Sequence, residues 1–438
     1  MRKIIFFIAF LLPFSASAKL LDLDFFMLDN GLQVAVIENH KAPVVLQMLY
    51  YKTGSINDPK GKGGIAHLLE HLMFRGTEKV PDKMFNRLTD EYGAANNAYT
   101  TFGETAYHEF SDISKLELMM ALEADRMQNL VISDEVFLKE REVVLEERRQ
   151  RFETKPAPLF YETLYKILWQ DAPMANPVSG SAADIKALTK EDAELFYKQW
   201  YRPENALLVL AGDITLAEAQ KLTQKYYGKI KNIGLMPSAP KYEASRPADM
   251  LFNMKLPSVE QPRFAQYIRL EPDSLTPTDN LALDLLTRYL SGDDTAYLYD
   301  KLVYQDKKFL GIDAGFSYDN DDGGMFGFYV APPDNTLSTE QIAELIDKNV
   351  KEGLKALTAE KLLKIKNQML SETVYLQENP QTAAKFVGEM LLADYSPDEI
   401  IHFDEAIKNI TVEDVLNAWA KVEKSVVRLN GYLSGETK

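Results

Sequence analysis

Two histidines stand four residues apart in the segment His67-Leu68-Leu69-Glu70-His71, with a glutamate directly before the second one. On a helix, positions 67, 70 and 71 lie within about one turn, so their side chains would project from one face. Two imidazoles there can bind one metal ion, and the carboxylate can act as a base. The chain has only five histidines, so chance explains the pattern poorly. It is the inverted form of the zincin motif and predicts a metal hydrolase, the alternative being a degenerate protein without metal.

A catalytic zinc ion usually takes three protein ligands and leaves a fourth position open, so a third ligand is needed. The chain contains no cysteine, which restricts the choice to histidine and carboxylate. A second predicted helix begins at Ser133, and its later turns carry Glu140, Glu142, Glu146 and Glu147. Residues seven apart share a helix face, so Glu140 and Glu147 could point together at the ion. Spacing alone does not choose among Glu140, Glu142, Glu146 and Glu147, and an ordinary solvated charged helix remains the alternative.

The motif helix must place its chemistry and its packing on different faces. Apolar residues recur at helical spacing around the histidines and predict a stripe that faces the core: they are Ile65, Leu68, Leu69, Leu72 and Met73. Three glycines at 61, 63 and 64 precede this helix. They either let the backbone pack closely or simply break the preceding loop, and the sequence does not decide between these interpretations.

The amino terminus predicts export. Residues 1–18 combine Arg2 and Lys3, an apolar run over 4–13 and the small residues Ala16-Ser17-Ala18, which is the pattern of a signal peptide. The apolar run is about ten residues long, too short to span a bilayer, so we expect no stable membrane anchor. If the signal is bacterial, the destination is the periplasm. The formal net charge of −16 argues against nucleic-acid binding and leaves basic peptides as the more plausible charged partners.

Other signals divide the chain of 438 residues into two domains. In the first part we expect a hairpin over 25–37 with an Asn-Gly turn, a strand over 44–51, a helix from Ser133 and a strand over 206–210. The proline-rich segment 234–247 predicts a linker between a domain at 19–233 and a domain at 248–438.

The second domain starts the pattern again, with extended runs near 250–256 and 264–270 and a helix from about Pro277. Both domains end on a similar unit. Thr189-Lys190-Glu191-Asp192 opens a helix that leads to the strand before Gly212, and Thr411-Val412-Glu413-Asp414 does the same before Gly431. This similarity indicates an internal duplication, in which the second copy has no His-x-x-Glu-His.

Four segments give the chain a specific resemblance, which extends over the mature sequence: GGIAHLLEHLMFRGT at 63–77, GAANNAYT at 93–100, EREVVLEE at 140–147 and YRPENALLVLAGDI at 201–214. In these it resembles the pitrilysin and insulysin family of zinc peptidases, which includes the mitochondrial processing peptidase. The resemblance implies an α+β fold of two homologous layered domains. Each would be a mixed, largely antiparallel sheet packed with helices.

The resemblance also implies residue roles. Glu147 becomes the third ligand of one Zn²⁺ per chain, and Glu140 supports the site from behind the ligands. Asn97, Ala98 and Tyr99 fall on the edge strand against which the family lays an extended substrate. His108 is expected to be structural. The reaction would be peptide-bond hydrolysis, in which zinc polarises the carbonyl and its water while Glu70 removes a proton.

One family feature is missing. The resemblance implies an Arg-x6-Tyr pair in the second domain that binds substrate and stabilises the oxyanion. Val303 stands at the arginine position, and the tyrosine position, Leu310 by this spacing with Gly311 next to it, holds no tyrosine. A related subunit that carries the pair could complete a heterodimer; otherwise a homodimer could suffice, or Tyr304 or Tyr318 could replace the donor. The competing function is a non-catalytic binding or assembly subunit of the same family. We expect an enzyme, because His67, Glu70, His71 and Glu147 are all intact.

Overall fold

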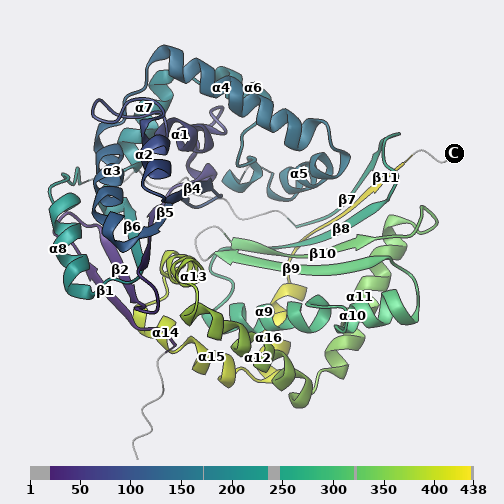
Figure 1. Cartoon of the computed structure of the whole chain (residues 1–438). Coiled ribbons are helices and arrows are strands. Elements are labelled where there is room, and N and C mark those ends of the chain that lie inside the picture. Colours follow the sequence, from purple (N-terminus) through teal and green to yellow (C-terminus); the bar gives the residue numbers. More distant parts are fainter. Residues whose placement is uncertain (1–19, 171, 235–246, 320–322, 436–438) are drawn as a thin grey trace, which may run out of the picture.

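The computed structural model of the chain describes residues 20–170, 172–234, 247–319 and 323–435. The predicted signal peptide at 1–18 and residues 235–246 of the predicted linker lie outside the described residues. What is described forms two halves, each built on one sheet with helices packed against it (Figure 1). This confirms the expected α+β architecture. Within these ranges, no helix has the length and apolar character needed to cross a membrane.

The first sheet has the strand order β1-β2-β6-β3-β5-β4, in which β2 and β6 are parallel and the other neighbours are antiparallel. The expected hairpin is β1 with β2, and its turn contains Gly31 at a φ of +90°. The strands are β1 Leu23–Met27, β2 Gln33–Glu38, β3 Val44–Tyr51, β4 Ala95–Thr100, β5 Thr105–Asp112 and β6 Ala206–Gly212. The central strands β3 and β6 are apolar along their length because both faces of the sheet are covered.

Helices of the first half cover one face of this sheet and enclose a large apolar core around Leu49, Leu69 and Leu208. The helices of this half are α1 Ile65–Met73, α2 Met84–Glu91, α3 Leu116–Asn129, α4 Asp134–Arg148, α5 Pro156–Trp169, α6 Ala182–Ala187, α7 Lys190–Trp200 and α8 Leu216–Tyr226. A π-helical turn, Arg149–Glu153, follows α4 directly. Ser133 caps α4 as predicted, since its hydroxyl accepts a hydrogen bond from the N–H of Val136.

The second sheet repeats the topology of the first. Its order is β7-β11-β8-β10-β9, with β7 and β11 parallel and the rest antiparallel, which matches β2-β6-β3-β5-β4 strand for strand. The strands are β7 Ala248–Lys255, β8 Arg263–Leu270, β9 Gly311–Asp319, β10 Gly323–Ala331 and β11 Val427–Ser434. The two similar helix starts both form capping boxes, at Thr189 with Asp192 and at Thr411 with Asp414. The repeated topology supports the predicted duplication.

The second half supplies its own helical layer and core, centred on residues such as Leu286, Phe326 and Ile346. Its helices are α9 Pro277–Ser291, α10 Tyr297–Tyr299, α11 Thr339–Ala356, α12 Ala359–Val374, α13 Pro380–Leu392, α14 Pro397–Ile401, α15 Phe403–Asn409 and α16 Val412–Glu423. The order of elements along the chain is the same in both halves. Helix α9 follows β7 and β8 as α1 follows β2 and β3, and α12 corresponds to α4 in this order.

Each half lends one helix to the other. Helix α5 of the first half packs on β8 and β11 of the second sheet, and α13 of the second half packs on β2, β3 and β6 of the first (Figure 1). In each of these two contacts, the helix and the sheet approach most closely where one of them has a glycine. A side chain at Gly431 of β11 would meet Leu164 of α5, and one at Gly388 of α13 would meet Tyr50 of β3. The division at 234–247 stays a prediction, and the packing interlocks the two halves.

Candidate metal centre

Helix α1 is held firmly at its amino terminus. The buried carboxylate of Asp58 accepts hydrogen bonds from the N–H groups of Gly64 and Ala66, at 2.6 and 3.1 Å. Gly64 has a φ of +88°, and a Cβ there would lie 2.7 Å from the backbone oxygen of Ser179. Of the two interpretations of the glycine cluster, close backbone packing is therefore correct for Gly64, while a Cβ at Gly61 would meet nothing within 4 Å.

The predicted apolar stripe of α1 is almost completely buried in the first core, so the opposite face carries the motif. Helix α4 packs against α1 and anchors itself through the buried side chains of Phe137 and Val144. This packing turns Glu140 and Glu147, two helical turns apart, toward the two histidines.

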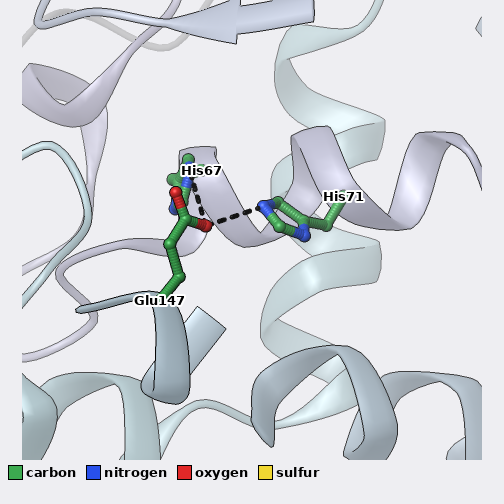
Figure 2. A group of neighbouring side chains, drawn as sticks. All are labelled: His67, His71 and Glu147. Atoms are coloured by element: carbon green, nitrogen blue, oxygen red, sulfur yellow. Dashed lines mark ion pairs between the residues drawn. The ribbon is translucent and has the colours of Figure 1, made fainter. Parts of the chain in front are cut away.

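The structure brings His67, His71 and Glu147 together, with one potential ligand atom of each within 4.8 Å of the others. Figure 2 shows Glu147 reaching from α4 to the two rings on α1: its Oε2 lies 3.8 Å from Nε2 of His67 and 3.4 Å from Nε2 of His71. Two ligands placed about 2.0–2.2 Å from a tetrahedral zinc ion are about 3.4 Å apart. The two distances from Glu147 are therefore close to the separation that a zinc ion requires.

Glu140 lies behind His71 rather than beside the other ligand atoms. Its Oε2 is 3.6 Å from Nδ1 of His71, its Oε1 is 2.9 Å from Nε of Arg75, and the side chain is buried. A carboxylate at Nδ1 fixes the imidazole with Nε2 directed at the metal position. The other two candidate ligands on α4 point elsewhere, since Glu146 is paired with Arg149 and Glu142 is exposed.

Without metal, the site holds its ligands in opposite protonation states. Burial, followed by the proximity of His71, lowers the pKa of His67 to about 4. Burial also lowers the pKa of His71, but the nearby carboxylates of Glu140 and Glu147 outweigh this and raise it to about 9. The contact with His71 lowers the pKa of Glu147 to about 2. One imidazole thus carries a proton beside an ionised carboxylate, and a bound cation would take over that charge.

Glu70 lines the same cavity as His67, His71 and Glu147, and its carboxylate is hydrogen-bonded to the edge strand β4. Its Oε2 accepts a 2.5 Å hydrogen bond from the hydroxyl of Thr100, the last residue of β4. Burial raises the pKa of the Glu70 carboxyl, although this hydrogen bond lowers it. Sequence reasoning missed Thr100; the signal was its place at the end of the GAANNAYT segment, one strand position beyond Tyr99.

A cavity of about 770 Å³ connects the motif with strand β4 and with the second half. Asn97, Ala98 and Tyr99 line it beside His67, Glu70, His71 and Glu147. Strand β4 is the edge of its sheet, so one side of its backbone has no partner strand among the described residues. Sequence reasoning did not foresee Arg151, whose guanidinium lies 3.0 Å from Oε1 of Glu147, or the lining that comes from α5, β8 and β10.

The positions of the missing donor pair lie away from this cavity lining. Val303 packs against the core of the second half, Leu310 is exposed, and Gly311 begins β9. Neither suggested replacement lines the cavity: Tyr304 is exposed, and the hydroxyl of Tyr318 is hydrogen-bonded to the backbone of Ser274 and Glu271. His108 is half-buried on β5, paired in the ladder with Met48 and Asn97.

Fold and site together define the class: a two-sheet α+β protein with the inverted zincin motif on a helix beside an edge strand. Two family models match consecutive parts of the chain. Residues 33–182 match "Insulinase (Peptidase family M16)", and residues 187–369 match "Peptidase M16 inactive domain". The chain belongs to peptidase family M16, which confirms the resemblance drawn from its motifs.

Individual relatives agree with this assignment. The zinc protease PqqE of Helicobacter pylori is 29% identical over 385 residues, 84% of this chain and 82% of that protein. The probable mitochondrial-processing peptidase subunit beta of Schizosaccharomyces pombe is 26% identical over 89% of this chain and 86% of that protein. Among solved structures, a protease from Helicobacter pylori matches with a TM-score of 0.85 at 24% identity, over 94% of this chain and all of that one. The periplasmic protease PqqL from Escherichia coli matches with a TM-score of 0.75 at 19% identity, over 95% of this chain and 48% of that one.

Proposed function

We propose that this protein is an exported zinc metallopeptidase that hydrolyses peptide bonds in peptides or unfolded segments. The observation that carries the proposal is the meeting of a His-His-Glu group, a neighbouring carboxylate and an unpaired strand edge in one cavity. His67, His71 and Glu147 would hold one zinc ion per chain. Relatives named zinc proteases support this choice of metal.

The ligands and the base have separate tasks. A bound zinc ion supplies Lewis-acid polarisation of the scissile carbonyl and of the attacking water. Glu70 accepts a proton from that water and delivers it to the departing amine nitrogen, as its buried position and raised pKa favour. Thr100 positions the Glu70 carboxylate through its hydrogen bond, and Glu140 positions His71. Arg151 balances part of the negative charge of Glu147.

The substrate would bind in extended form along β4. Backbone groups of Asn97, Ala98 and Tyr99 would pair with the peptide, which gives affinity without strong dependence on sequence. This mode requires an unfolded segment, because the backbone N–H and C=O groups of a segment inside a helix or sheet are already hydrogen-bonded. The free edge of β4 beside the motif supports this role.

The working enzyme would be a heterodimer, with a related subunit that supplies the arginine absent at Val303 and the tyrosine absent at Leu310 and Gly311. The separation of these positions from the cavity lining supports a donor from another chain. Export rests on the predicted signal peptide at 1–18, and the similarity to PqqL, which is named a periplasmic protease, supports a periplasmic location.

The substitution Glu70→Gln tests the enzymatic role. It removes the proton acceptor and keeps the metal ligands, so we expect about one zinc ion per chain and a hydrolysis rate lower by at least about a thousandfold. Zinc would be measured by elemental analysis and turnover with a quenched fluorescent peptide. Unchanged turnover would remove Glu70 from the mechanism. The loss of zinc would assign it a structural role instead.

The assembly is tested with the purified chain. We expect little peptidase activity from the chain alone and a large increase when a family member with the Arg-x6-Tyr pair is added. High activity of the isolated chain would reject the heterodimer. If neither the chain nor the mixture hydrolyses peptides while zinc is fully bound, the non-catalytic alternative becomes the better description. A relative named as a subunit of the cytochrome b-c1 complex, from Bos taurus, supports keeping this alternative: it matches 46% of the chain at 28% identity.

A further inference from the structure

Three arginines follow Glu147 within four residues, and they have different partners. The first, Arg148, is buried and lies 2.7 Å from the carboxylate of Glu162. The second, Arg149, lies on the surface and donates two hydrogen bonds to Glu146, at 2.8 and 2.7 Å. The charges of these two arginines are therefore compensated by carboxylates of their own.

The third arginine, Arg151, lies in the π-helical turn after α4 and lines the cavity of the candidate metal centre. It is the only lysine or arginine among the described residues of that lining. Its Nη2 lies 3.0 Å from Oε1 of Glu147, while Oε2 of Glu147 faces the two imidazoles. The Arg151 side chain is nevertheless 64% exposed, so other N–H groups of its guanidinium remain accessible.

A bound zinc ion would change the charge balance of this lining. Without metal, Glu147 is the partner of Arg151. A zinc ion would add two positive charges and take Glu147 as a ligand. Of the other carboxylates in the lining, Glu162 is paired with Arg148, so Glu70 alone stands against the ion and Arg151. The loaded centre would be locally positive, although the chain as a whole has a net charge of −16.

The charge of Arg151 reaches the other groups of the centre. Burial is the largest influence on the pKa of both His67 and Glu70, and the positive charge of Arg151 acts to lower each of these pKa values. Charges in a partly buried site are screened less than charges on an open surface. An anionic group of a peptide that enters this part of the cavity would therefore be attracted to the guanidinium.

The chemistry of the guanidinium selects the kind of anion. Its planar fork of N–H donors matches the two oxygens of a carboxylate, and its five N–H groups allow contact with a second carboxylate besides Glu147. A peptide carries a carboxylate either on an acidic side chain or at its free carboxyl terminus. Backbone pairing along β4 depends little on sequence, so Arg151 is a place where charge can select the substrate.

We propose that Arg151 is a specificity-determining residue that binds a carboxylate group of the peptide substrate beside the metal centre. This inference rests on the proposed peptidase function. The acidic surface of the whole chain favours basic peptides, whereas the site at Arg151 favours a peptide with a carboxylate at this one position.

Peptide binding tests the proposal and separates the two sources of the carboxylate. The full-length Glu70→Gln protein, with zinc in excess, would be titrated with acetylated and amidated serine and threonine peptides that carry one Glu, Gln or Lys, moved along the host. A further Gln peptide has a free carboxyl terminus. We expect the Glu peptide, the free-acid peptide or both to bind about tenfold more tightly than the amidated Gln peptide.

The peptide that gains affinity identifies the source as a side chain or the carboxyl terminus. Equal affinities of the carboxylate and amide peptides, tightest binding of the Lys peptide, or no detectable binding of any peptide would overturn the proposal.

Variants locate the effect at one guanidinium. Arg151→Gln should abolish the preference for the carboxylate, and Arg151→Lys should keep a few-fold preference, because the charge stays and the fork of donors is lost. Arg149→Gln is the matched control: it removes an exposed arginine two residues away, outside the cavity lining, and should keep the full preference. Zinc content would be measured in each variant by elemental analysis.

Two results with these variants would overturn the proposal. A preference that persists in Arg151→Gln would place the carboxylate on the metal ion or elsewhere. An equal loss in Arg149→Gln and Arg151→Gln would show a general effect of charge. Both side chains are more than half exposed, so neither substitution removes core packing.

Cleavage by the unmodified enzyme separates this inference from the proposed function. If carboxylate peptides bind selectively through Arg151 but the chain, alone or with its partner, hydrolyses none of them, the peptidase function fails and the site at Arg151 stands. If the enzyme cleaves the carboxylate and amide peptides with the same kcat/KM and binds them equally, the site fails and the peptidase function stands.

Discussion

The two halves of this protein share one topology but use the same place in it differently. In the first half, α1 and α4 meet at His67, His71 and Glu147. In the second half, the corresponding helices α9 and α12 meet at an ion pair, in which Arg288 donates two hydrogen bonds to Glu372, at 2.8 and 2.9 Å. A guanidinium satisfies the carboxylate by itself. Two imidazoles beside a carboxylate form instead a group that could hold a metal ion.

The comparison teaches that the layered scaffold places a carboxylate at a helix–helix contact in both halves, while the opposing residues decide its chemistry. Glu147 and Glu372 each lie near the carboxyl end of their helix. Arginine at the contact gives a structural ion pair, and the histidine pair gives a group that could hold a metal ion. The second half instead contributes Tyr267, Met325 and Tyr329 to the lining of the cavity.

The sharpest test of this comparison replaces one carboxylate oxygen by an amide nitrogen in each half, at Glu147 and at Glu372. Glu147→Gln removes an anionic ligand atom, so we expect zinc affinity to fall by more than about a hundredfold. The matched variant Glu372→Gln removes the carboxylate of an exposed ion pair and should leave zinc affinity unchanged. Competition with a chromogenic chelator measures both. Full zinc affinity in Glu147→Gln would move the third ligand to Glu146 or Glu142.

The exchanged helices predict that the halves unfold together. Leu164 of α5 is fully buried against the second sheet, and Val387 of α13 is fully buried against the first. We expect Leu164→Ala to lower the free energy of unfolding by about 3 kcal/mol and Val387→Ala by about 2 kcal/mol. In both variants the whole molecule should unfold in one transition, followed in urea by circular dichroism and tryptophan fluorescence. Two separated transitions would show that the halves are independent.

The approach to the motif helix contains two glycines whose substitution separates backbone conformation from close packing. Gly64→Ala meets a positive φ and a backbone oxygen at 2.7 Å, so we expect a loss of about 2 kcal/mol or more. Gly61→Ala meets only a φ of +76° and should cost about 1 kcal/mol. Thermal unfolding of the zinc-free proteins gives both values. Equal losses would mean that the contact with Ser179 does not constrain α1.

The contact between the halves should also depend on pH through Glu104. Burial, and then the charge of Glu389 on α13, raise the pKa of Glu104 to about 7. Because the folded pKa exceeds the unfolded one, this group stabilises the fold below about pH 4.5 and loses that contribution as the pH rises through about 7. Glu104→Gln should therefore be more stable than the parent by about 1 kcal/mol at pH 8.5, allowing for partial exposure, and show no such gain at pH 4.5. Denaturant unfolding at both pH values checks the difference, and an equal difference at both would exclude Glu104 as its origin.

Local signals in the sequence predicted the elements that position the site. The period of apolar residues around His67 and His71 required a helix with its chemistry on one face, and α1 has this form. The Asn-Gly turn, the Ser133 cap and the Thr189 and Thr411 capping boxes are each determined within a few residues, which is why they could be predicted. The motifs that identify the family are likewise contiguous stretches of the chain.

By itself, then, the sequence determined the helix with its histidine pair and base, the family and the repeated pattern of two sheets, because all of these depend on local spacing. Only the tertiary structure decided that Glu147 and not Glu146 faces the histidines, since that depends on how α4 rotates when Phe137 and Val144 enter the core. It also decided the bond from Thr100 to Glu70 and the exchange of α5 and α13 between the halves. These features join residues distant in the chain. Their geometry follows from the packing of apolar side chains, which a local sequence pattern does not predict.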